Sequence, residues 1–384
     1  MRTFLLVLDS FGVGAAPDAD KYGDAGSHTY NSVTMNKHCT IPTLTKLGLT
    51  NIDGLVPKTE DFISKIVRLE ELSNGKDSTT GHWEMAGIIT KTPFPTYPNG
   101  FSDEILNKLK KAWGVKEILC NKPYSGTEVL LDYGKEHRAK HAPIVYTSAD
   151  SVLQIACHED EFPVKKLHEM CEQARKIMCG KDAVSRIIAR PFVGEHPNYT
   201  RTENRKDFSI DPPKNHLFEL VQKAGKSTIS IGKINDLFNN KNIDFMYPNN
   251  GNDGEIQSLF DAQTKNFDGL CWLNFCDFDS KYGHRNDSDG YAKALSVVDQ
   301  ALSKFIQNMQ DDDLLIITAD HGCDPATPST DHSREYVPCI LYKKGITPEN
   351  LGTKKGFNHI GATVLKELGI DTKVETLSSD YSLL

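Results

Sequence analysis

The sequence predicts an α/β protein with a mainly parallel central sheet flanked by helices and a smaller α/β unit inserted into it. Apolar runs of strand length alternate with segments of helical periodicity, and several of these runs end directly in Asp or His. Single hydrophobic cores stop growing near about 250 to 300 residues. A chain of 384 residues is therefore expected to form two domains.

Composition narrows the class of protein. The charged fraction of 25% and the hydrophobic fraction of 38% are typical of a globular protein, and no apolar run approaches the roughly 20 residues of a membrane span. A net charge of -8 argues against nucleic-acid binding. The nine cysteines form no CxxC pair, so neither a disulfide framework nor a zinc motif is indicated, and a cytoplasmic location is expected. The oligomeric state stays open, with a monomer as one option.

The first part of the chain predicts a strand at 3–8, which ends at Asp9 before a glycine-rich turn. A short helix near 42–49 and a strand at 62–69 follow. The next stretch, GKDSTTGHWE, places Ser78 and two further hydroxyls ahead of a predicted helix at 83–89, where backbone N–H groups favour negative charge. That position suits a phosphorylated nucleophile. A plain helix cap is the alternative for the hydroxyls, and also for Asp9.

A change in composition, to a stretch rich in proline, marks the start of the insertion. The proline-dense stretch at 92–100 resembles a linker, and Pro212-Pro213 marks the return. Between them the pattern predicts helices at 102–113 and 164–178 and strands at 143–149, 152–156 and 184–193. We therefore expect a core made of residues 1–94 and 210–384 and an inserted domain made of residues 95–209.

The last part of the chain alternates again between the two periods. Helices are predicted at 217–224, around 256–260, at 291–309 and at 360–368, and strands at 227–231, 269–275, 314–317 and 337–342. The strand at 227–231 leads to Lys233. The next leads to Asp279 and His284, and the strand at 314–317 leads to Asp320, His321 and, after a loop, His332.

Three strands thus end in residues that bind hard metals. A parallel sheet brings its carboxyl ends to one edge, so these residues are expected to converge. Three Asp, three His and Ser78 make seven groups, about enough for two divalent ions with a shared hydroxyl. Each Asp-His motif by itself is equally compatible with a simple turn after a strand.

Several strings along nearly the whole chain carry a specific resemblance. FLLVLDSFGVGAAPDA, GKDSTTGHWE, YTSADSVLQIA, ARPFVGE, IGKINDLF, NFCDFDSKYGH, TADHGCDP and TDHSREYVP occur in an order and at a spacing that resemble phosphopentomutases of the prokaryotic type. That family belongs to the alkaline phosphatase superfamily of metalloenzymes. The resemblance implies an alkaline-phosphatase-like core.

The resemblance also implies roles for individual residues. Ser78 matches the phosphorylated nucleophile, where the family usually has Thr, and Thr79 is a minor alternative. One metal, usually Mn²⁺ in the family, would be bound by Asp9, Asp320 and His321 with the phosphorylated side chain. The other would be bound by a second set of three ligands, Asp279, His284 and His332.

The insertion resembles the family's cap domain, which covers the metal site and holds the sugar. Asp150 matches the residue that binds the ribose hydroxyls, and Ser148 lies beside it. Arg190, Arg201 and Lys233 match basic positions near the substrate phosphate, although the two arginines are also compatible with structural ion pairs. Asp277 and His82 are open between a supporting role and none, and Cys323 stands where many relatives have Asn, with no role assigned.

The implied activity is the reversible transfer of phosphate between C1 and C5 of ribose or 2-deoxyribose, through a phosphoserine and a bisphosphate intermediate. The partner would be a small-molecule pentose phosphate. The activator would be a sugar bisphosphate, glucose 1,6-bisphosphate or ribose 1,5-bisphosphate. The rivals are a cofactor-independent phosphoglycerate mutase, which would want a Glu where Thr79 stands, a phosphatase or phosphonate hydrolase, and an inactive sugar-phosphate binding module.

Overall fold

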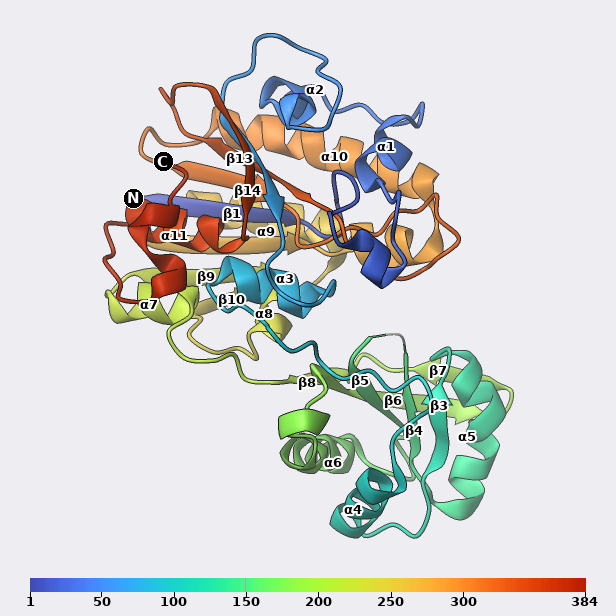
Figure 1. Ribbon diagram of the computed structural model, residues 1–384. Helices are drawn as coiled ribbons and strands as arrows, with labels where there is room; N and C mark the ends of the chain where they lie inside the picture. The colour runs from blue at the N-terminus through green and yellow to red at the C-terminus, as the bar shows by residue number, and fades with distance from the viewer. Residues whose placement is uncertain (149) are drawn as a thin grey trace. The chain divides into compact units, whose positions relative to one another are not determined.

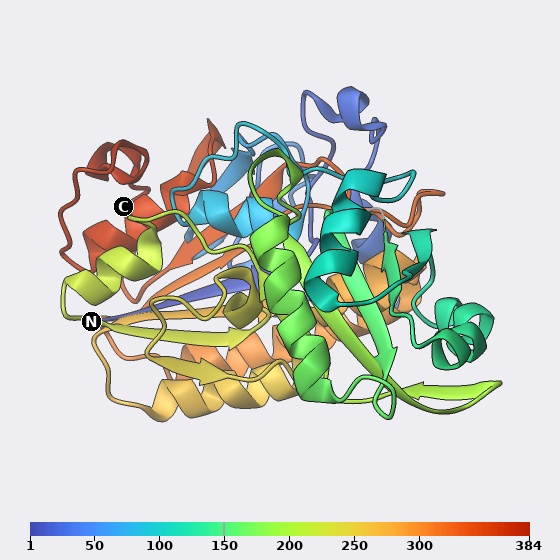
Figure 2. The ribbon, with the colours of Figure 1, turned by 90° about the horizontal axis from the view of Figure 1, so that it is seen from below.

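The computed structural model describes residues 1–148 and 150–384, which divide into two compact units (Figures 1 and 2). The larger unit combines Met1–Pro93 with Pro212–Leu384, and the smaller unit is the continuous segment Phe94–Asp211. The predicted insertion covered residues 95–209. None of the helices in the described part of the chain is both long and apolar enough to cross a membrane.

The larger unit is built on an eight-stranded sheet. Its spatial order is β10 (Phe245–Tyr247), β9 (Ser227–Gly232), β11 (Gly269–Phe275), β1 (Arg2–Leu8), β12 (Leu314–Thr318), β13 (Val337–Tyr342), β2 (Lys65–Glu70) and β14 (Glu349–Lys355). The first five are mutually parallel. β13 is antiparallel to both its neighbours, and β14 is parallel to β2. The prediction of a mainly parallel sheet is confirmed.

The centre of this sheet consists of apolar strands that are buried on both faces. Every residue of β1, β11 and β12 is buried, and Leu6 of β1 pairs with Leu273 on one side and Ile317 on the other. Figures 1 and 2 both show the blue first strand among strands from the second half of the chain. Strands without a polar face need helices on both sides. Their parallel direction also puts their carboxyl ends at one edge.

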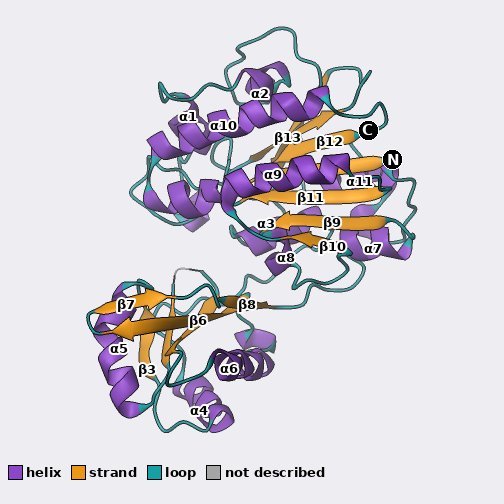
Figure 3. Ribbon diagram, turned by 180° about the vertical axis from the view of Figure 1, so that it is seen from behind, coloured by secondary structure: helices purple, strands orange, loops and turns teal. Residues whose placement is uncertain are grey.

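Helices cover both faces of the sheet (Figures 1 and 3). One face carries α9 (Gly251–Thr264) and α10 (Ser288–Gln307), and the opposite face carries α3 (Ser78–Met85), α7 (Leu217–Lys223), α8 (Ile234–Leu237) and α11 (Asn358–Glu367). α1 (Thr29–Thr34) and α2 (Pro42–Lys46) pack against α10. One face of α10, which includes Leu295 and Leu302, is buried, and the Phe305 ring lies 5.0 Å from that of Phe4 in β1. The remaining short helical turns are Ala19–Tyr22, Leu49–Asn51, Gly180–Asp182, Phe278–Tyr282, Gly283–Arg285, Glu375–Leu377 and Ser379–Tyr381.

The smaller unit is a second α/β layer structure. Its sheet contains β3 (Leu119–Pro123), β4 (Ile144–Thr147), β5 (Val152–His158), β6 (Arg186–Glu195) and β7 (Asn198–Arg201), and β8 (Lys206–Ser209) pairs with β6. α4 (Asp103–Trp113) and α6 (Val164–Ile177) pack together on one face, and α5 (Glu128–Lys140) contacts β3, β4, β5 and β7. The side chains of β4 alternate between two apolar clusters, because successive residues of a strand point to opposite faces.

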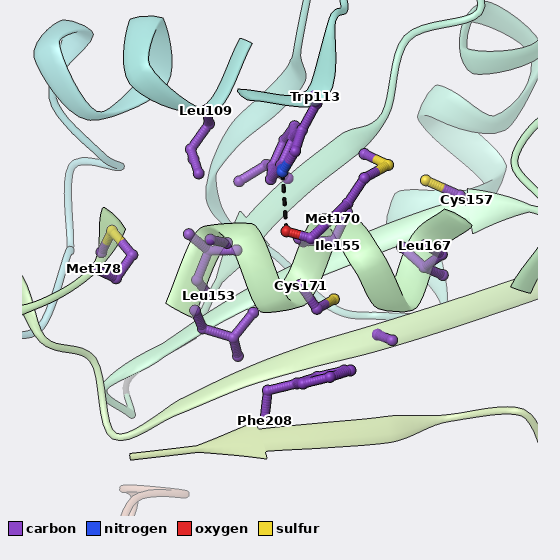
Figure 4. Packing of buried hydrophobic residues seen from close by; sticks show 14 of the residues in the cluster. Leu109, Trp113, Leu153, Ile155, Cys157, Leu167, Met170, Cys171, Met178 and Phe208 are labelled. Atoms are coloured by element: carbon purple, nitrogen blue, oxygen red, sulfur yellow. Dashed lines mark hydrogen bonds between the residues drawn. The ribbon is translucent and has the colours of Figure 1, made fainter. Parts of the chain in front are cut away.

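Figure 4 shows the larger of these clusters, in which Leu109 and Trp113 of α4 pack over α6. The buried indole N–H of Trp113 donates to the carbonyl oxygen of Met170 at 2.9 Å, so this large ring is buried without losing a hydrogen bond. Leu153 and Ile155 of β5 supply the sheet side of the cluster. The smaller unit therefore has a core of its own.

Candidate active site and metal centre

Four neighbouring parallel strands deliver charged side chains to one edge of the large sheet. Lys233 follows β9, Asp279 follows β11, Asp9 follows β1 and Asp320 follows β12. Asp9, Asp279 and Asp320 are buried, with 0%, 3% and 0% of their surface exposed. Strand order thus brings together residues from both ends of the chain.

Helix α3 adds Ser78 to this edge, and Gly81 permits the approach. A Cβ atom at position 81 would lie 2.2 Å from the carbonyl oxygen of Asp320, so a larger residue would push the helix away. With glycine there, Ser78 Oγ lies 3.1 Å from His321 Nε2. The approach of α3 to the end of β12 therefore sets the position of the Ser78 hydroxyl.

The start of α3 differs from its predicted start at residue 83. The helix begins at Ser78 because the Asp77 carboxylate caps it, accepting the amide N–H groups of Thr79 and Thr80 at 3.0 and 3.2 Å. The cap is therefore Asp77 and none of the three hydroxyl residues. Because these two amide groups already donate to Asp77, the expectation that they would stabilise an added negative charge is wrong for them.

Asp9, Asp320 and His321 form a first cluster with the spacing of metal ligands, since one ligand atom of each lies within 4.8 Å of the others. His321 Nε2 is 3.4 Å from Asp9 Oδ1 and 3.2 Å from Asp320 Oδ2. Nδ1 of the same ring faces the carbonyl oxygen of Gly322 at 3.0 Å. This contact fixes the ring so that Nε2 points toward the carboxylates.

A second cluster surrounds Asp279. His284 Nε2 lies 3.3 Å from Asp279 Oδ2, and His332 Nε2 lies 3.3 Å from Asp279 Oδ1. The other ring nitrogen of His284 faces the carbonyl oxygen of Thr330 at 2.7 Å. The two clusters adjoin, because the rings of His321 and His332 are 4.1 Å apart. All six predicted metal ligands thus lie together. Cys323, to which the sequence assigned no role, also lies close to Asp279 and His284.

The electrostatics of the two clusters fit divalent cations. Burial, with the nearby charges of Asp320 and Asp279, raises the pKa of Asp9. Burial opposes protonation of the imidazoles, yet Asp320 raises the pKa of His321 to about 10 and Asp279 raises that of His284 to about 12. Among the described residues, Asp9 Oδ1, Asp279 Oδ1 and Asp320 Oδ2 are buried and accept no regular hydrogen bond. Buried carboxylate oxygens and imidazole nitrogens that attract positive charge are what Mn²⁺ or Zn²⁺ requires.

Lys233 links the proposed nucleophile to the first cluster. Its Nζ atom donates to Ser78 Oγ at 2.6 Å and to Asp9 Oδ2 at 3.0 Å, and it lies 3.8 Å from Asp279 Oδ2. The sequence placed Lys233 near the substrate phosphate. Contact with Ser78 itself was missed, because it depends on β9 lying two strands away from β1.

Two residues that the sequence left open now differ. His82 Nδ1 donates to the backbone oxygen of Ser78 at 2.8 Å and lies 3.2 Å from Asp320 Oδ2. His82 therefore helps to hold both Ser78 and Asp320 in position. Asp277 instead accepts the amide of Asn252 at 3.0 Å at the start of α9 and pairs with Lys281 at 2.9 Å. Asp277 therefore faces away from the ligand set.

In the smaller unit, the predicted sugar-binding residues have partners within that unit. Asp150 Oδ2 lies 3.4 Å from the guanidinium of Arg186, and the Asp150 amide donates to Ser148 Oγ at 3.3 Å. Arg190 donates to Gln154 Oε1 at 3.2 Å and Arg201 donates to the Gly126 carbonyl at 3.1 Å.

Positive charge is concentrated on this part of the unit. Burial, together with neighbouring Arg205 and Arg201, lowers the pKa of Arg190 to about 10. Sequence reasoning missed Arg186 and Arg205 as neighbours of the site residues. A usable signal existed for Arg186, because Arg186 and Arg190 are four residues apart on β6 and residues at even spacing share a strand face.

The comparisons with known proteins agree with these features. The family model of the metalloenzyme superfamily matches residues 1–372. A phosphopentomutase of Lachnoclostridium phytofermentans is 49% identical over 382 residues, which is 97% of each chain. A phosphopentomutase of Acetivibrio thermocellus is 46% identical over the whole of both chains.

Among solved structures, PH0037 from Pyrococcus horikoshii has a TM-score of 0.52 at 12% identity and covers 97% of both chains, which shows a shared fold. The identities of 46% and 49%, over nearly the whole of each chain, establish the family. These relatives confirm the resemblance to phosphopentomutases that the motifs TADHG and TDHSREYVP indicated. The chain belongs to the phosphopentomutase family of isomerases, within the metalloenzyme superfamily.

Proposed function

We propose that this chain interconverts α-D-ribose 1-phosphate and D-ribose 5-phosphate, and the 2-deoxyribose equivalents, through phosphorylated Ser78 and a bisphosphate intermediate. The observation that carries the proposal is the position of Ser78 Oγ, 2.6 Å from Lys233 Nζ and 3.1 Å from His321 Nε2. A serine hydroxyl placed between a cation and a metal-ligand cluster is suited to accept and release a phosphoryl group. The same contacts favour Ser78 over Thr79 as the nucleophile.

The proposed ligands are Asp9, Asp320 and His321 for one divalent ion and Asp279, His284 and His332 for the other, with Mn²⁺ as the proposed metal. When bound there, two such ions neutralise the phosphoryl oxygens and lower the pKa of the serine hydroxyl. The unsatisfied oxygens of the three buried carboxylates support this assignment.

The chain's own groups then carry the transfer. The Oγ–P bond of phosphorylated Ser78 breaks as a bond forms between the phosphorus and the free hydroxyl oxygen of the sugar monophosphate, and the hydroxyl proton is passed to Oγ. The resulting bisphosphate turns and returns its other phosphoryl group to Ser78. Lys233 stabilises the negative charge that develops on Oγ when the bond breaks, because its ammonium already donates to that atom.

We further propose that the smaller unit supplies the residues that recognise the sugar phosphate. Asp150 and Ser148 are proposed to bind the sugar hydroxyls, and Arg190 and Arg201 the phosphate. The concentration of positive charge at Arg190, Arg201 and Arg205 supports the second assignment. The neutral oxygen partners of Arg190 and Arg201, Gln154 and Gly126, favour it over a purely structural ion pair.

Two further parts of the proposal concern the activator and the cellular location. A sugar bisphosphate, glucose 1,6-bisphosphate or ribose 1,5-bisphosphate, is proposed to load Ser78 with its first phosphoryl group. A cytoplasmic location is proposed because all nine cysteines are free thiols, which is usual in a reducing compartment.

The decisive experiment is a coupled assay of ribose 1-phosphate conversion to ribose 5-phosphate with Mn²⁺ and a sugar bisphosphate, with and without chelator. Conversion that requires both additions supports the proposal. Release of inorganic phosphate from ribose 5-phosphate without isomerisation would identify a phosphatase. Isomerisation of phosphoglycerate would identify the other mutase. Binding of ribose 5-phosphate without turnover would indicate a binding module.

A further inference from the structure

Cys323 lies beside two of the proposed ligands of the second metal site, Asp279 and His284. It follows the first-cluster ligand His321 by two residues, and only 1% of its surface is exposed. Its Sγ atom and one ligand atom each from Asp279 and His284 all lie within 4.8 Å of one another. This spacing is that of atoms that can share one metal ion.

The surrounding chain makes room for the thiol at this place. A Cβ atom at position 283 would lie 2.9 Å from Cys323 Sγ, so any side chain there would collide with it. Gly283 has φ of -56°, a value that every residue adopts, so space and not backbone conformation explains the glycine. The Cys323 amide donates to the Ser10 carbonyl and to Thr29 Oγ1, both at 3.1 Å, which fixes the residue in position.

An independent observation shows that the cluster is suited to a cation. Asp279 is 3% exposed, and among the described residues its Oδ1 atom accepts no regular hydrogen bond. His332 Nε2 lies 3.3 Å from this oxygen without a regular hydrogen bond, and a buried carboxylate oxygen in such a place is costly unless a cation approaches it. The His284 ring is oriented by the Thr330 carbonyl, so its Nε2 also faces Asp279.

We propose that Cys323 is a fourth protein ligand of the second metal site, beside Asp279, His284 and His332, and that it shifts the preference of this site toward softer ions such as Zn²⁺ and Co²⁺. This inference rests on the metal centre of the proposed function. Thiolate sulfur binds Zn²⁺ and Co²⁺ better than Mn²⁺, whereas the amide oxygen of Asn does not discriminate in this direction. Thiolate sulfur, imidazole nitrogen and carboxylate oxygen all bind Zn²⁺, which accepts four such ligands.

The competing interpretation is a buried thiol with a packing role only. Cys323 Sγ lies 3.5 Å from the Asp331 carbonyl oxygen, and a weak S–H hydrogen bond there would hold the loop that carries His332. Such a thiol would contribute nothing to metal preference. The two interpretations therefore differ in metal binding and not in folding alone.

The test compares the wild-type chain with Cys323→Asn, which replaces the thiol by an amide, and with Cys323→Ser. Cys276→Ser is the matched control, because Cys276 is also buried near the strand ends but its Sγ lies 3.1 Å from Asn249 Oδ1. Each protein is stripped of metal, loaded with two equivalents of Co²⁺ or Zn²⁺, and studied by ultraviolet absorption and by zinc-edge X-ray absorption. Competition with Mn²⁺ gives the selectivity ratio.

The expected result is a thiolate-to-cobalt charge-transfer band and a Zn–S distance of about 2.3 Å in the wild type and in Cys276→Ser. Both signals should be absent in the two Cys323 variants, and the Zn²⁺-over-Mn²⁺ ratio should fall by at least about tenfold. The X-ray absorption of the wild type stands alone if a variant does not fold.

Two outcomes would overturn the inference. If two ions bind the wild type without a sulfur ligand, or with a selectivity equal to that of Cys323→Asn, Cys323 is not a ligand and the proposed function is unaffected. If no divalent ion binds the wild type, the metal centre of the proposed function fails together with this inference.

Discussion

The ammonium group of Lys233 donates to Ser78 Oγ at 2.6 Å and to Asp9 Oδ2 at 3.0 Å. One flexible cation from the end of β9 therefore contacts the proposed nucleophile and a proposed metal ligand at the same time. The positive charge of this ammonium group offsets negative charge on Ser78 Oγ, both when a phosphoryl group is donated and when it is accepted. One of the two side chains described in contact with Ser78 Oγ thus comes from the end of β9, a position that was expected only to face the substrate phosphate.

Replacing Lys233 by Met should lower kcat about 100-fold or more, because one preorganised donor to the reacting oxygen is lost. Steady-state mutase kinetics measure the effect. Lys226→Met is a suitable control, since Lys226 pairs with Asp268 at 2.6 Å on the surface, and its kcat should stay within about twofold. A folded Lys233→Met protein with wild-type kcat would contradict the role of Lys233.

Ser78→Ala should reduce mutase activity at least about a thousandfold, because the hydroxyl that carries the phosphoryl group is gone. Ser78→Thr, which keeps a hydroxyl at this position, should retain activity within about tenfold. Intact mass after treatment with a sugar bisphosphate should show one added phosphoryl group in the wild type and in Ser78→Thr only. Near-normal activity of Ser78→Ala would shift attention to Thr79.

Asp150→Ala should impair the mutase reaction about tenfold more than hydrolysis of a simple aryl phosphate, because only the mutase substrate offers sugar hydroxyls to bind. Both rates are measured on one preparation. Arg186→Gln removes the ion-pair partner of Asp150 and controls for local structural damage. Equal losses in both reactions would exclude the sugar-binding role of Asp150.

Removal of divalent metal should abolish mutase activity and lower Tm, because the buried carboxylates of Asp9, Asp279 and Asp320 lose the charge that offsets them. Mn²⁺ at 100 times its Kd should restore about 2.7 kcal/mol of stability. Thermal unfolding with and without chelator measures this. Asp277→Asn should keep the metal-dependent stabilisation and Asp9→Asn should lose most of it. An identical Tm with and without metal would argue against the site.

His137 should make the stability of the chain depend on pH. Burial lowers the pKa of its imidazole to about 4, and the neutral ring donates from Nδ1 to the Ala142 carbonyl at 2.7 Å and accepts the His158 amide at Nε2 at 2.9 Å. The unfolded chain binds a proton near pH 6.5, so this contribution is complete above about pH 6.5 and is lost as pH falls toward 4. The loss should be on the order of 2 to 3 kcal/mol.

The measurement for His137 is urea unfolding between pH 7 and 4.5. His137→Gln should have a shallower dependence of unfolding free energy on pH than the wild type. His168→Gln, in which a partly exposed imidazole of α6 is replaced, should keep the wild-type slope. Equal slopes for wild type and His137→Gln would show that the imidazole is not held neutral.

The sequence predicts best those elements whose residues are nearly all buried, because burial alone then determines the pattern of apolar residues. The bounds of β11 and β13 agree with prediction because these strands are continuous apolar runs that are buried almost throughout. β14 escaped prediction because it is a polar edge strand, with little buried surface and a register shift between Asn350 and Thr353. α5 escaped it because Gly134 interrupts its middle and its apolar periodicity is weak.

The candidate site divides in a similar way. Asp9 lies one position, Asp320 two positions and Asp279 four positions after the end of a recognisable buried strand, so their meeting at one edge could be expected from parallel strands alone. The Lys233 contact with Ser78 required the order of strands, which no local pattern contains. The position of Cys323 near His284 likewise depends on how two loops fold over each other.

The strand order also fixes when the site can form during synthesis. Arg2 of β1 pairs with Gly269 and Thr3 with Leu314, so the first strand leaves the ribosome long before either neighbour exists. The segment Phe94–Asp211 is continuous and has its own core, so it can fold first. A chain that stops before β12 lacks both Asp320 and His321. A translation product that ends between residue 211 and β12 would therefore contain the whole smaller unit and lack Asp320, His321 and His332 among the six proposed metal ligands.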